Sequence, residues 1–166
     1  MPRTTKEDVI KLTGEEESTF EPVRTDDTLL FSITNAEVRK SERGFPYVNY
    51  EARVLDGEYK GRVVFDIIGV QGSDPDKTKR TLGSLQDRMR ALTGKPLVAS
   101  GTAAELAATV ARAIKGTKFA AKVTVDEPAD EEAREEWNEK GWTPKNRIKR
   151  MLPAASYKAT SDKKSW

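Results

Sequence analysis

Residues 44–66, with the sequence GFPYVNYEARVLDGEYKGRVVFD, carry the clearest structural pattern in the chain. Its first half alternates apolar and polar side chains with the period of two that is typical of a half-buried β-strand. A strand over 46–55 would turn one set of side chains toward a core: Val48, Tyr50, Ala52 and Val54. It would turn the other set outward: Tyr47, Asn49, Glu51 and Arg53. This segment therefore predicts a sheet with one buried face.

The second half of the stretch predicts a return strand. Asp56-Gly57 is a turn signal, and Gly61 marks a second tight point before a strand over 62–69. The side chains of that strand that we expect to face the core are Val63, Phe65 and Ile67. Phe65, like Tyr50, is accordingly predicted to be a core aromatic residue rather than a stacking surface.

Another strand precedes this pair, over 28–39. Its first apolar residues share one face: Leu29, Phe31 and Ile33. The alternation then slips by one residue, and Ala36 and Val38 become the apolar pair. A slip of this kind indicates a β-bulge, which bends a strand. With a polar turn over 41–44, the three strands form a meander.

Helical periodicity follows the meander. Leucine and methionine recur at helical spacing over 76–92, and Gly94 ends that helix. A second helix begins at Thr102, whose pairing with Glu105 fits a capping box. Strands over 117–125 and 146–152 complete the pattern. The acidic segment between them includes a short helix closed by Gly141. We expect Trp137 and Trp142, which flank this loop, to pack against the sheet.

This order of elements predicts a mainly β, α+β fold: a five-stranded OB-type barrel with one or two helices between strands three and four. An SH3-like barrel has a similar number of strands, but the helical insertion favours the OB type. The domain would span 20–153, between a flexible arm over 1–19 and a flexible basic tail over 154–166.

Composition excludes several classes of site. The chain of 166 residues has neither cysteine nor histidine, so disulfides, Cys/His zinc sites and Ser-His-Asp triads are ruled out. No apolar run approaches the ~20 residues of a membrane span. The first residues lack the apolar segment of a signal peptide, and we expect a cytoplasmic location with no membrane partner.

The segment over 44–66 resembles a phage-encoded family of small proteins from replication and recombination cassettes, often described as single-stranded-DNA-binding. The likeness lies in the E-Y-K-G-R turn from Glu58, the strand ending F-D at Asp66, and the closing segment NRIKRMLP over 146–153. It implies a non-catalytic protein that binds single-stranded DNA in the host cytoplasm during replication or recombination. Partners would include a recombinase or replication protein, and a homo-oligomer is allowed.

Single-strand binding requires cations for phosphates and aromatic rings for bases. The residues that we predict to contact nucleic acid are Phe45, Tyr47, Asn49, Arg53, Tyr59, Lys60, Arg62, Lys118, Lys122, Arg147 and Lys149. A solvated strand face would carry similar side chains. The alternative function is a protein–protein adaptor on the same scaffold, without nucleic acid.

We predict no catalytic residue, no metal ligand and no cofactor. Glu58 and Lys60, with Asp66 nearby, superficially resemble the carboxylate–lysine set of a metal nuclease. Both Glu58 and Lys60 fall in a tight turn between glycines, where charged residues are ordinary. Binding without catalysis is therefore the expectation.

Overall fold

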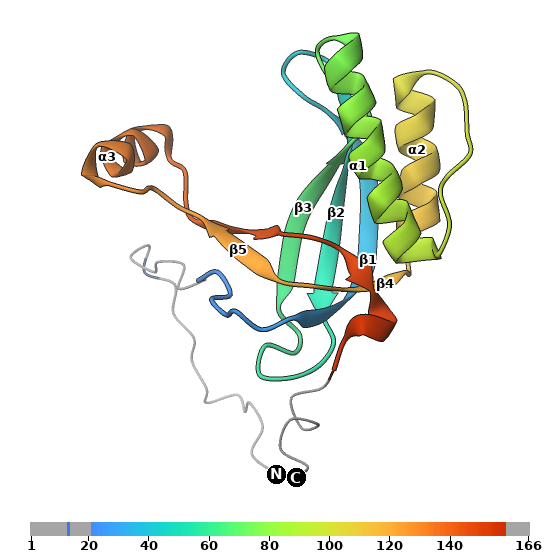
Figure 1. Cartoon of the computed structure of the whole chain (residues 1–166). Coiled ribbons are helices and arrows are strands. Elements are labelled where there is room, and N and C mark those ends of the chain that lie inside the picture. The colour runs from blue at the N-terminus through green and yellow to red at the C-terminus, as the bar shows by residue number, and fades with distance from the viewer. Residues whose placement is uncertain (1–12, 14–20, 159–166) are drawn as a thin grey trace.

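The computed structural model describes residue 13 and residues 21–158, which form an α+β fold with antiparallel sheets (Figure 1). The elements of this part of the chain, in order, are β1 Leu29–Lys40, β2 Pro46–Val54, β3 Val63–Gly69, α1 Pro75–Thr93, α2 Ala103–Ile114, β4 Lys118–Ala121, β5 Val123–Asp126, α3 Glu131–Lys140, β6 Lys145–Ile148, β7 Leu152–Pro153 and a 3-10 helix at Ala154–Ser156. Mixed α+β architecture with helices between the third and fourth predicted strands is confirmed.

The strands form two sheets. The larger has the order β3-β2-β1-β4-β7 and the smaller consists of β5 and β6, and every pairing is antiparallel. Each of the last two predicted strands is thus divided: β4 and β5 are separated by Lys122, and β6 and β7 by residues 149–151. The hydrogen-bonded ladder ends at β3 and β7 and does not close into a barrel.

The predicted bulge in β1 is present. The pairing register with β2 shifts between Ile33 and Asn35, which leaves Thr34 as the extra residue. The Thr34 hydroxyl donates a hydrogen bond of 2.6 Å to the carboxylate of Glu51 on β2. Ala36 is buried after the shift, whereas Val38 is exposed near the end of the strand.

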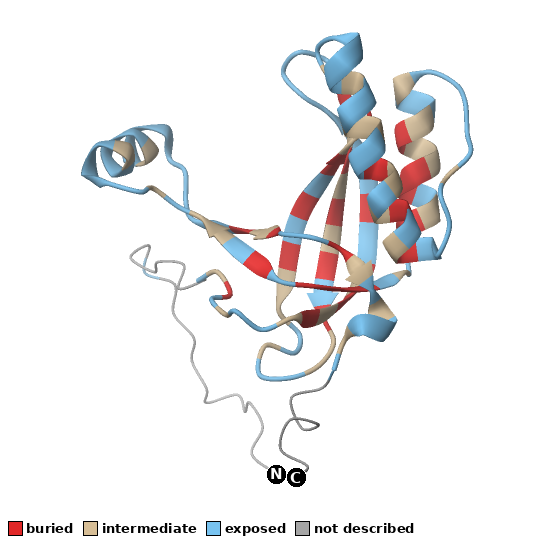
Figure 2. Ribbon diagram, viewed as in Figure 1, coloured by how far each residue is buried: buried red, intermediate tan, exposed pale blue. Residues whose placement is uncertain are grey.

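The core lies between the β1–β2–β3 meander and the elements packed on it, namely α1, α2, β4 and β6 (Figure 2). As predicted, the inward side chains of β2 are all fully buried: Val48, Tyr50, Ala52 and Val54. Phe31 of β1 stacks on Phe119 of β4 with ring centroids 5.0 Å apart. Helix α2 packs on β1 and β2, and α1 packs on β3 and β7, so the helices cover one part of the sheet (Figure 1).

The predicted phase of β3 is wrong by one residue. The buried side chains are Val64, Asp66 and Ile68, whereas Phe65 is 58% and Ile67 43% exposed. Pairing explains the difference: Val63 lies opposite Arg53, which points outward, and residues directly opposite share a face. Because VVFDIIG is apolar at almost every position, alternation alone does not fix its phase.

A single carboxylate joins β3 to β6. Asp66 is 8% exposed, and its Oδ2 accepts a 2.9 Å hydrogen bond from the backbone N–H of Ile148. Its Oδ1 lies 3.4 Å from a guanidinium nitrogen of Arg147. Burial raises the pKa of the neighbouring Tyr50 far above its ordinary value, and the charge of Asp66 acts in the same direction.

The helix ends follow local rules. Asp74 caps α1 by accepting the N–H of Lys77, and Gly94 ends that helix in the left-handed conformation. The predicted capping box of Thr102 and Glu105 opens α2. Helix α3 contains no buried residue and ends at Gly141, and with β5 and β6 it forms an arm that projects from the sheet (Figure 1).

Ordered contacts continue past the predicted domain boundary at 153. After the 3-10 helix, the Tyr157 hydroxyl donates a 2.8 Å hydrogen bond to the carboxylate of Asp56. The proposed arm over 1–19, apart from Thr13, and the end of the proposed tail over 159–166 lie outside the described residues. None of the helices in the described ranges is long and apolar enough to cross a bilayer.

Candidate nucleic-acid interface

The outward face of β2 and β3 carries Phe65 and Ile67, the most exposed large apolar side chains in the strands of the described residues. Four cross-strand pairs form it: Tyr47 with Gly69, Asn49 with Ile67, Glu51 with Phe65, and Arg53 with Val63. Phe65 and Ile67 project into solvent beside half-buried Tyr47 and Asn49. We define these four side chains as the strand face.

Arg53 stands at one end of this face, and Lys118 of β4 continues the same row on the far side of β1. Ser32 of β1 lies opposite Arg53 of β2 on one side and opposite Lys118 of β4 on the other. All three side chains therefore point outward in one row across the sheet. Arg53 and Lys118 are both exposed, so their charges are available to an anion that approaches the row.

The carboxylates on the same side of the sheet already have partners. Glu37 accepts hydrogen bonds from the guanidinium of Arg39, which lies opposite Tyr47. Glu51, opposite Phe65, accepts the hydroxyl of Thr34. Arg39 offsets the negative charge of Glu37, whereas Thr34 is neutral and Glu51 keeps its charge, so the electrostatic cost of bringing a phosphate to the strand face is lowest away from Glu51.

The structure brings together only some of the predicted contact residues. Tyr47, Asn49, Arg53 and Lys118 share the outward side of the sheet. Phe45 lies half-buried immediately before β2, where its N–H donates to the Ser41 hydroxyl.

The residues of the β2–β3 turn have a different role. The Tyr59 hydroxyl donates a 3.0 Å hydrogen bond to the backbone carbonyl of Arg24, and its ring packs on the core. Arg62 donates to the backbone carbonyl of Glu21. Lys60 is exposed in the turn between them. Tyr59 and Arg62 thus hold the segment that precedes β1 against the turn.

The remaining predicted cations lie on β6 or next to β5 and β6. Arg147 lies between two carboxylates, 3.4 Å from Asp66 and 3.6 Å from Asp126, so its charge is largely engaged. Lys122 and Lys149 are exposed where their strands break, and the N–H of Lys149 donates to the carbonyl of Lys122 at 3.0 Å. These two lysines therefore stand next to each other, apart from the row of Arg53 and Lys118.

The tryptophans form a separate cluster on the arm. Trp137 and Trp142 pack edge to face with centroids 5.8 Å apart, and the Lys140 ammonium lies 4.5 Å from the Trp142 ring. A pocket of about 550 Å³ beside them is also lined by Lys145 and Arg147. The two rings contact each other and lie beside β5 and β6, and neither belongs to the hydrophobic core of the described residues.

Comparison with known proteins adds no identity. No protein-family model matches this chain, and no curated protein matches it. The site therefore rests on geometry alone. Its most exposed members, Phe65 and Ile67, were missed by the sequence reading, and the signal that could have found them is the pairing of Val63 with Arg53 across the turn.

Proposed function

We propose that this protein binds single-stranded DNA without catalysis, during replication or recombination in the cytoplasm of a phage-infected cell. The strand would lie across the strand face, with bases on Phe65 and phosphates near Arg53 and Lys118. A recombinase or replication protein would act on the DNA that it presents.

The proposal includes the fold type: we interpret the strands as those of an OB-type barrel. In that interpretation β4 and β5 are one bent strand, and β6 and β7 are another, which gives five strands with the helices after the third. The adjacency of β6 and β3 through Asp66 supports closure on that side. Strands two and three of such barrels are where oligonucleotides lie.

The observation that carries the proposal is the exposure of Phe65 and Ile67 on the outer face of β3. Large apolar side chains that stand side by side in solvent mark an interaction surface more often than isolated ones do. A phenyl ring accepts any nucleobase by stacking, at about 1–3 kcal/mol per base. Arg53 and Lys118, which form no ion pair within residues 13 and 21–158, would supply the sequence-independent attraction to phosphate.

The test compares Phe65→Ala with Val98→Ala in fluorescence anisotropy titrations. Val98 is 94% exposed in the connection between α1 and α2, so it matches Phe65 as an exposed apolar side chain away from the face. Phe65→Ala should lower affinity for a labelled single strand by roughly five- to 150-fold, the equivalent of one base stack. Val98→Ala should leave it unchanged.

A labelled duplex and a second salt concentration complete the experiment. Wild-type protein should prefer the single strand, and its affinity should fall as salt rises, because neutralised phosphates release counterions. Equal affinity of the Phe65→Ala variant and wild type would contradict the strand face as the site. No binding in dilute buffer would contradict the function.

A protein–protein adaptor is the second candidate, and the arm favours it. Helix α3 buries none of its residues, and Trp142 is 52% exposed beside Trp137. Tryptophan is enriched at protein interfaces. If this candidate holds, wild-type protein binds neither oligonucleotide, and a Trp137→Ala/Trp142→Ala variant loses a partner that wild type retains in affinity purification.

A further inference from the structure

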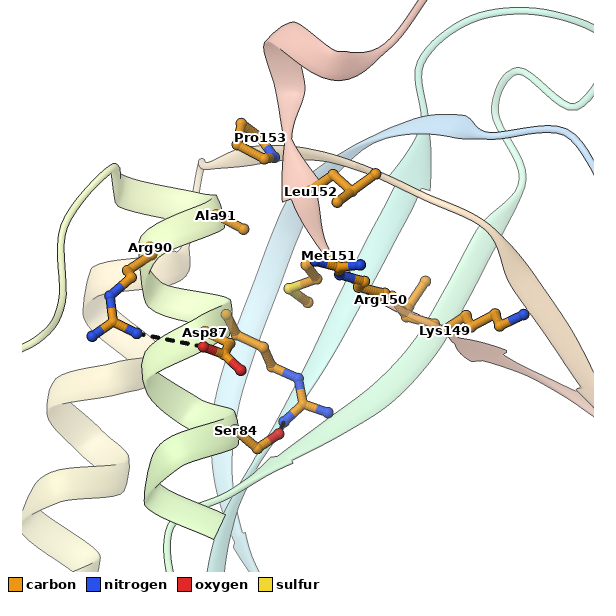
Figure 3. Close-up of a pocket in the computed structure, with 11 residues that line it drawn as sticks. Ser84, Asp87, Arg90, Ala91, Lys149, Arg150, Met151, Leu152 and Pro153 are labelled. Atoms are coloured by element: carbon orange, nitrogen blue, oxygen red, sulfur yellow. Dashed lines mark hydrogen bonds and ion pairs between the residues drawn. The ribbon is translucent and has the colours of Figure 1, made fainter. Parts of the chain in front are cut away.

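A cationic cleft lies between α1 and the segment that links β6 to β7, away from the strand face (Figure 3). Its volume is about 390 Å³. Ser84, Asp87 and Arg90 project from α1 on one side, and Lys149 to Pro153 form the other side (Figure 3). The cleft thus joins two parts of the chain that are more than 50 residues apart in sequence.

The lining has an excess of positive charge. Four cations contribute to it, namely Arg88, Arg90, Lys149 and Arg150. The single carboxylate among the described lining residues, Asp87, lies 3.4 Å from Arg90. Arg88 donates a 3.2 Å hydrogen bond to the hydroxyl of Ser84, and within the described part of the chain it forms no ion pair with a carboxylate.

Lys149 and Arg150 are the cations most available to a ligand. Both are exposed, and among residues 13 and 21–158 neither has a side-chain hydrogen bond or ion pair. In Figure 3 the side chain of Lys149 extends away from α1, along the rim rather than into the cleft. Lys122 lies beside that rim through the backbone hydrogen bond to Lys149.

The floor of the cleft is apolar and fixed. Ile148 and Met151 are each 8% exposed and belong to the core, so the backbone that carries the two cations is anchored on both sides of them. Cations held on rigid elements lose less freedom on binding than those of a mobile tail. An extended anion with several charges matches this arrangement better than a single ion does.

We propose that this cleft binds successive phosphates of a nucleic-acid strand, and so extends the DNA path from the strand face to the helical side of the molecule. The inference rests on the proposed function, since it takes its ligand from it. The cleft would be a second contact region, which binds phosphates and does not stack on bases. The length of strand that the protein occupies would therefore exceed what the strand face alone covers.

The experiment uses two variants with the same loss of charge. Lys149→Gln/Arg150→Gln changes the cleft, and Arg112→Gln/Lys115→Gln removes two exposed cations from α2 and its C-terminal cap, neither of which lines the cleft. Oligothymidines of about 6 and about 20 nucleotides are titrated at several salt concentrations, since one OB-type surface occupies roughly 4–16 nucleotides. Thermal midpoints establish that both variants are folded.

The cleft variant should bind the long oligonucleotide severalfold more weakly than wild type, and the short one with unchanged affinity. Its log–log salt slope on the long strand should decrease by about 1.4, which corresponds to two phosphates at about 0.7 each. The α2 variant should keep the wild-type slope. Inorganic tripolyphosphate should compete with the long strand for wild type but not for the cleft variant.

Each contrary result has a separate meaning. Wild type that binds neither oligonucleotide defeats the proposed function, and this inference with it. Wild type that binds both, with cleft and α2 variants alike on the long strand, overturns this inference alone. Cleft-dependent binding of tripolyphosphate together with cleft-independent strand binding also overturns it, because the cleft would then hold a free anion.

Discussion

The carboxylate of Asp66 accepts the backbone N–H of Ile148 at 2.9 Å, and the two residues are 82 positions apart in the chain. They lie on β3 and β6, which belong to different hydrogen-bonded sheets. A side chain therefore supplies the bond that a strand ladder would otherwise provide at this junction. Together with the Arg147–Asp66 ion pair, this contact helps to hold the arm against β3.

Asp66→Ala should destabilise the protein by about 1–3 kcal/mol, because the buried N–H of Ile148 loses its acceptor. Asp66→Asn is the matched control, since an amide oxygen can still accept that N–H while the ion pair with Arg147 is lost. Urea unfolding should place the Asn variant between Ala and wild type. Equal stability of the Ala variant and wild type would show that β6 does not depend on this bond.

The phase of β3 can be tested by stability alone. Tyr50→Ala should cost about 3–5 kcal/mol, as for other large buried aromatics, because Tyr50 is 1% exposed. Phe65→Ala should change the free energy of unfolding by less than ~0.5 kcal/mol, since Phe65 is 58% exposed. The reverse order in denaturant titrations would mean that Phe65 faces the core after all.

Arg53 and Arg62 should separate binding from structure. Arg53→Gln should weaken binding of every single strand alike and reduce the log–log salt slope by about 0.7, the value for one phosphate contact. Arg62→Gln should leave the slope unchanged, because that guanidinium is bonded to the backbone carbonyl of Glu21. Anisotropy at three salt concentrations measures both, and equal slopes for the two variants would contradict the assignment.

Tyr50 should make stability depend on alkaline pH. Burial raises its pKa in the folded protein above the ordinary value of 10.0, so the unfolded chain releases this proton first. Stability from the neutral phenol is complete below pH 10 and falls above it, by about 1.4 kcal/mol per pH unit. Unfolding titrations on both sides of that pH should show a steeper loss for wild type than for Tyr50→Phe.

Tyr157 should stabilise the end of the described chain. Tyr157→Phe removes the donor to the Asp56 carboxylate and should cost about 1 kcal/mol. Truncation after Pro153 should cost at least as much, because it also removes the 3-10 helix that packs on β4. Thermal unfolding of both variants checks this, and an unchanged midpoint for the truncation would show that the domain ends at 153.

Local patterns predicted much of the fold. The bulge at Thr34, the buried face of β2 and the capping box of α2 each depend on residues close together in sequence, and each is present. The phase of β3 does not follow from such a pattern, because apolar residues occupy both of its faces. Its one polar residue, Asp66, is buried by partners on β6, more than 80 residues away.

The candidate site was predicted only in part for the same reason. Tyr47 and Arg53 follow from the alternation of β2, whereas Phe65 depends on the phase of β3. Cations that look equivalent in sequence differ in the structure: Lys118 is exposed in the row across the sheet, and Arg147 is engaged by two carboxylates. The cleft requires α1 to contact residues 149–153, and this contact cannot be predicted from the sequence of either segment alone.

The buried amide of Asn146 has a consequence for how the chain folds. Its Oδ1 accepts the N–H of Val23, and its Nδ2 donates to the carbonyl of Val23, both at 2.8 Å, across 123 residues. Contacts of such sequence separation form late, because the loop must close before they contribute, whereas the β1–β2–β3 meander closes locally. The segment before β1 can therefore meet the β2–β3 turn early, through Tyr59 and Arg62, but completes its contacts only after β6 has docked.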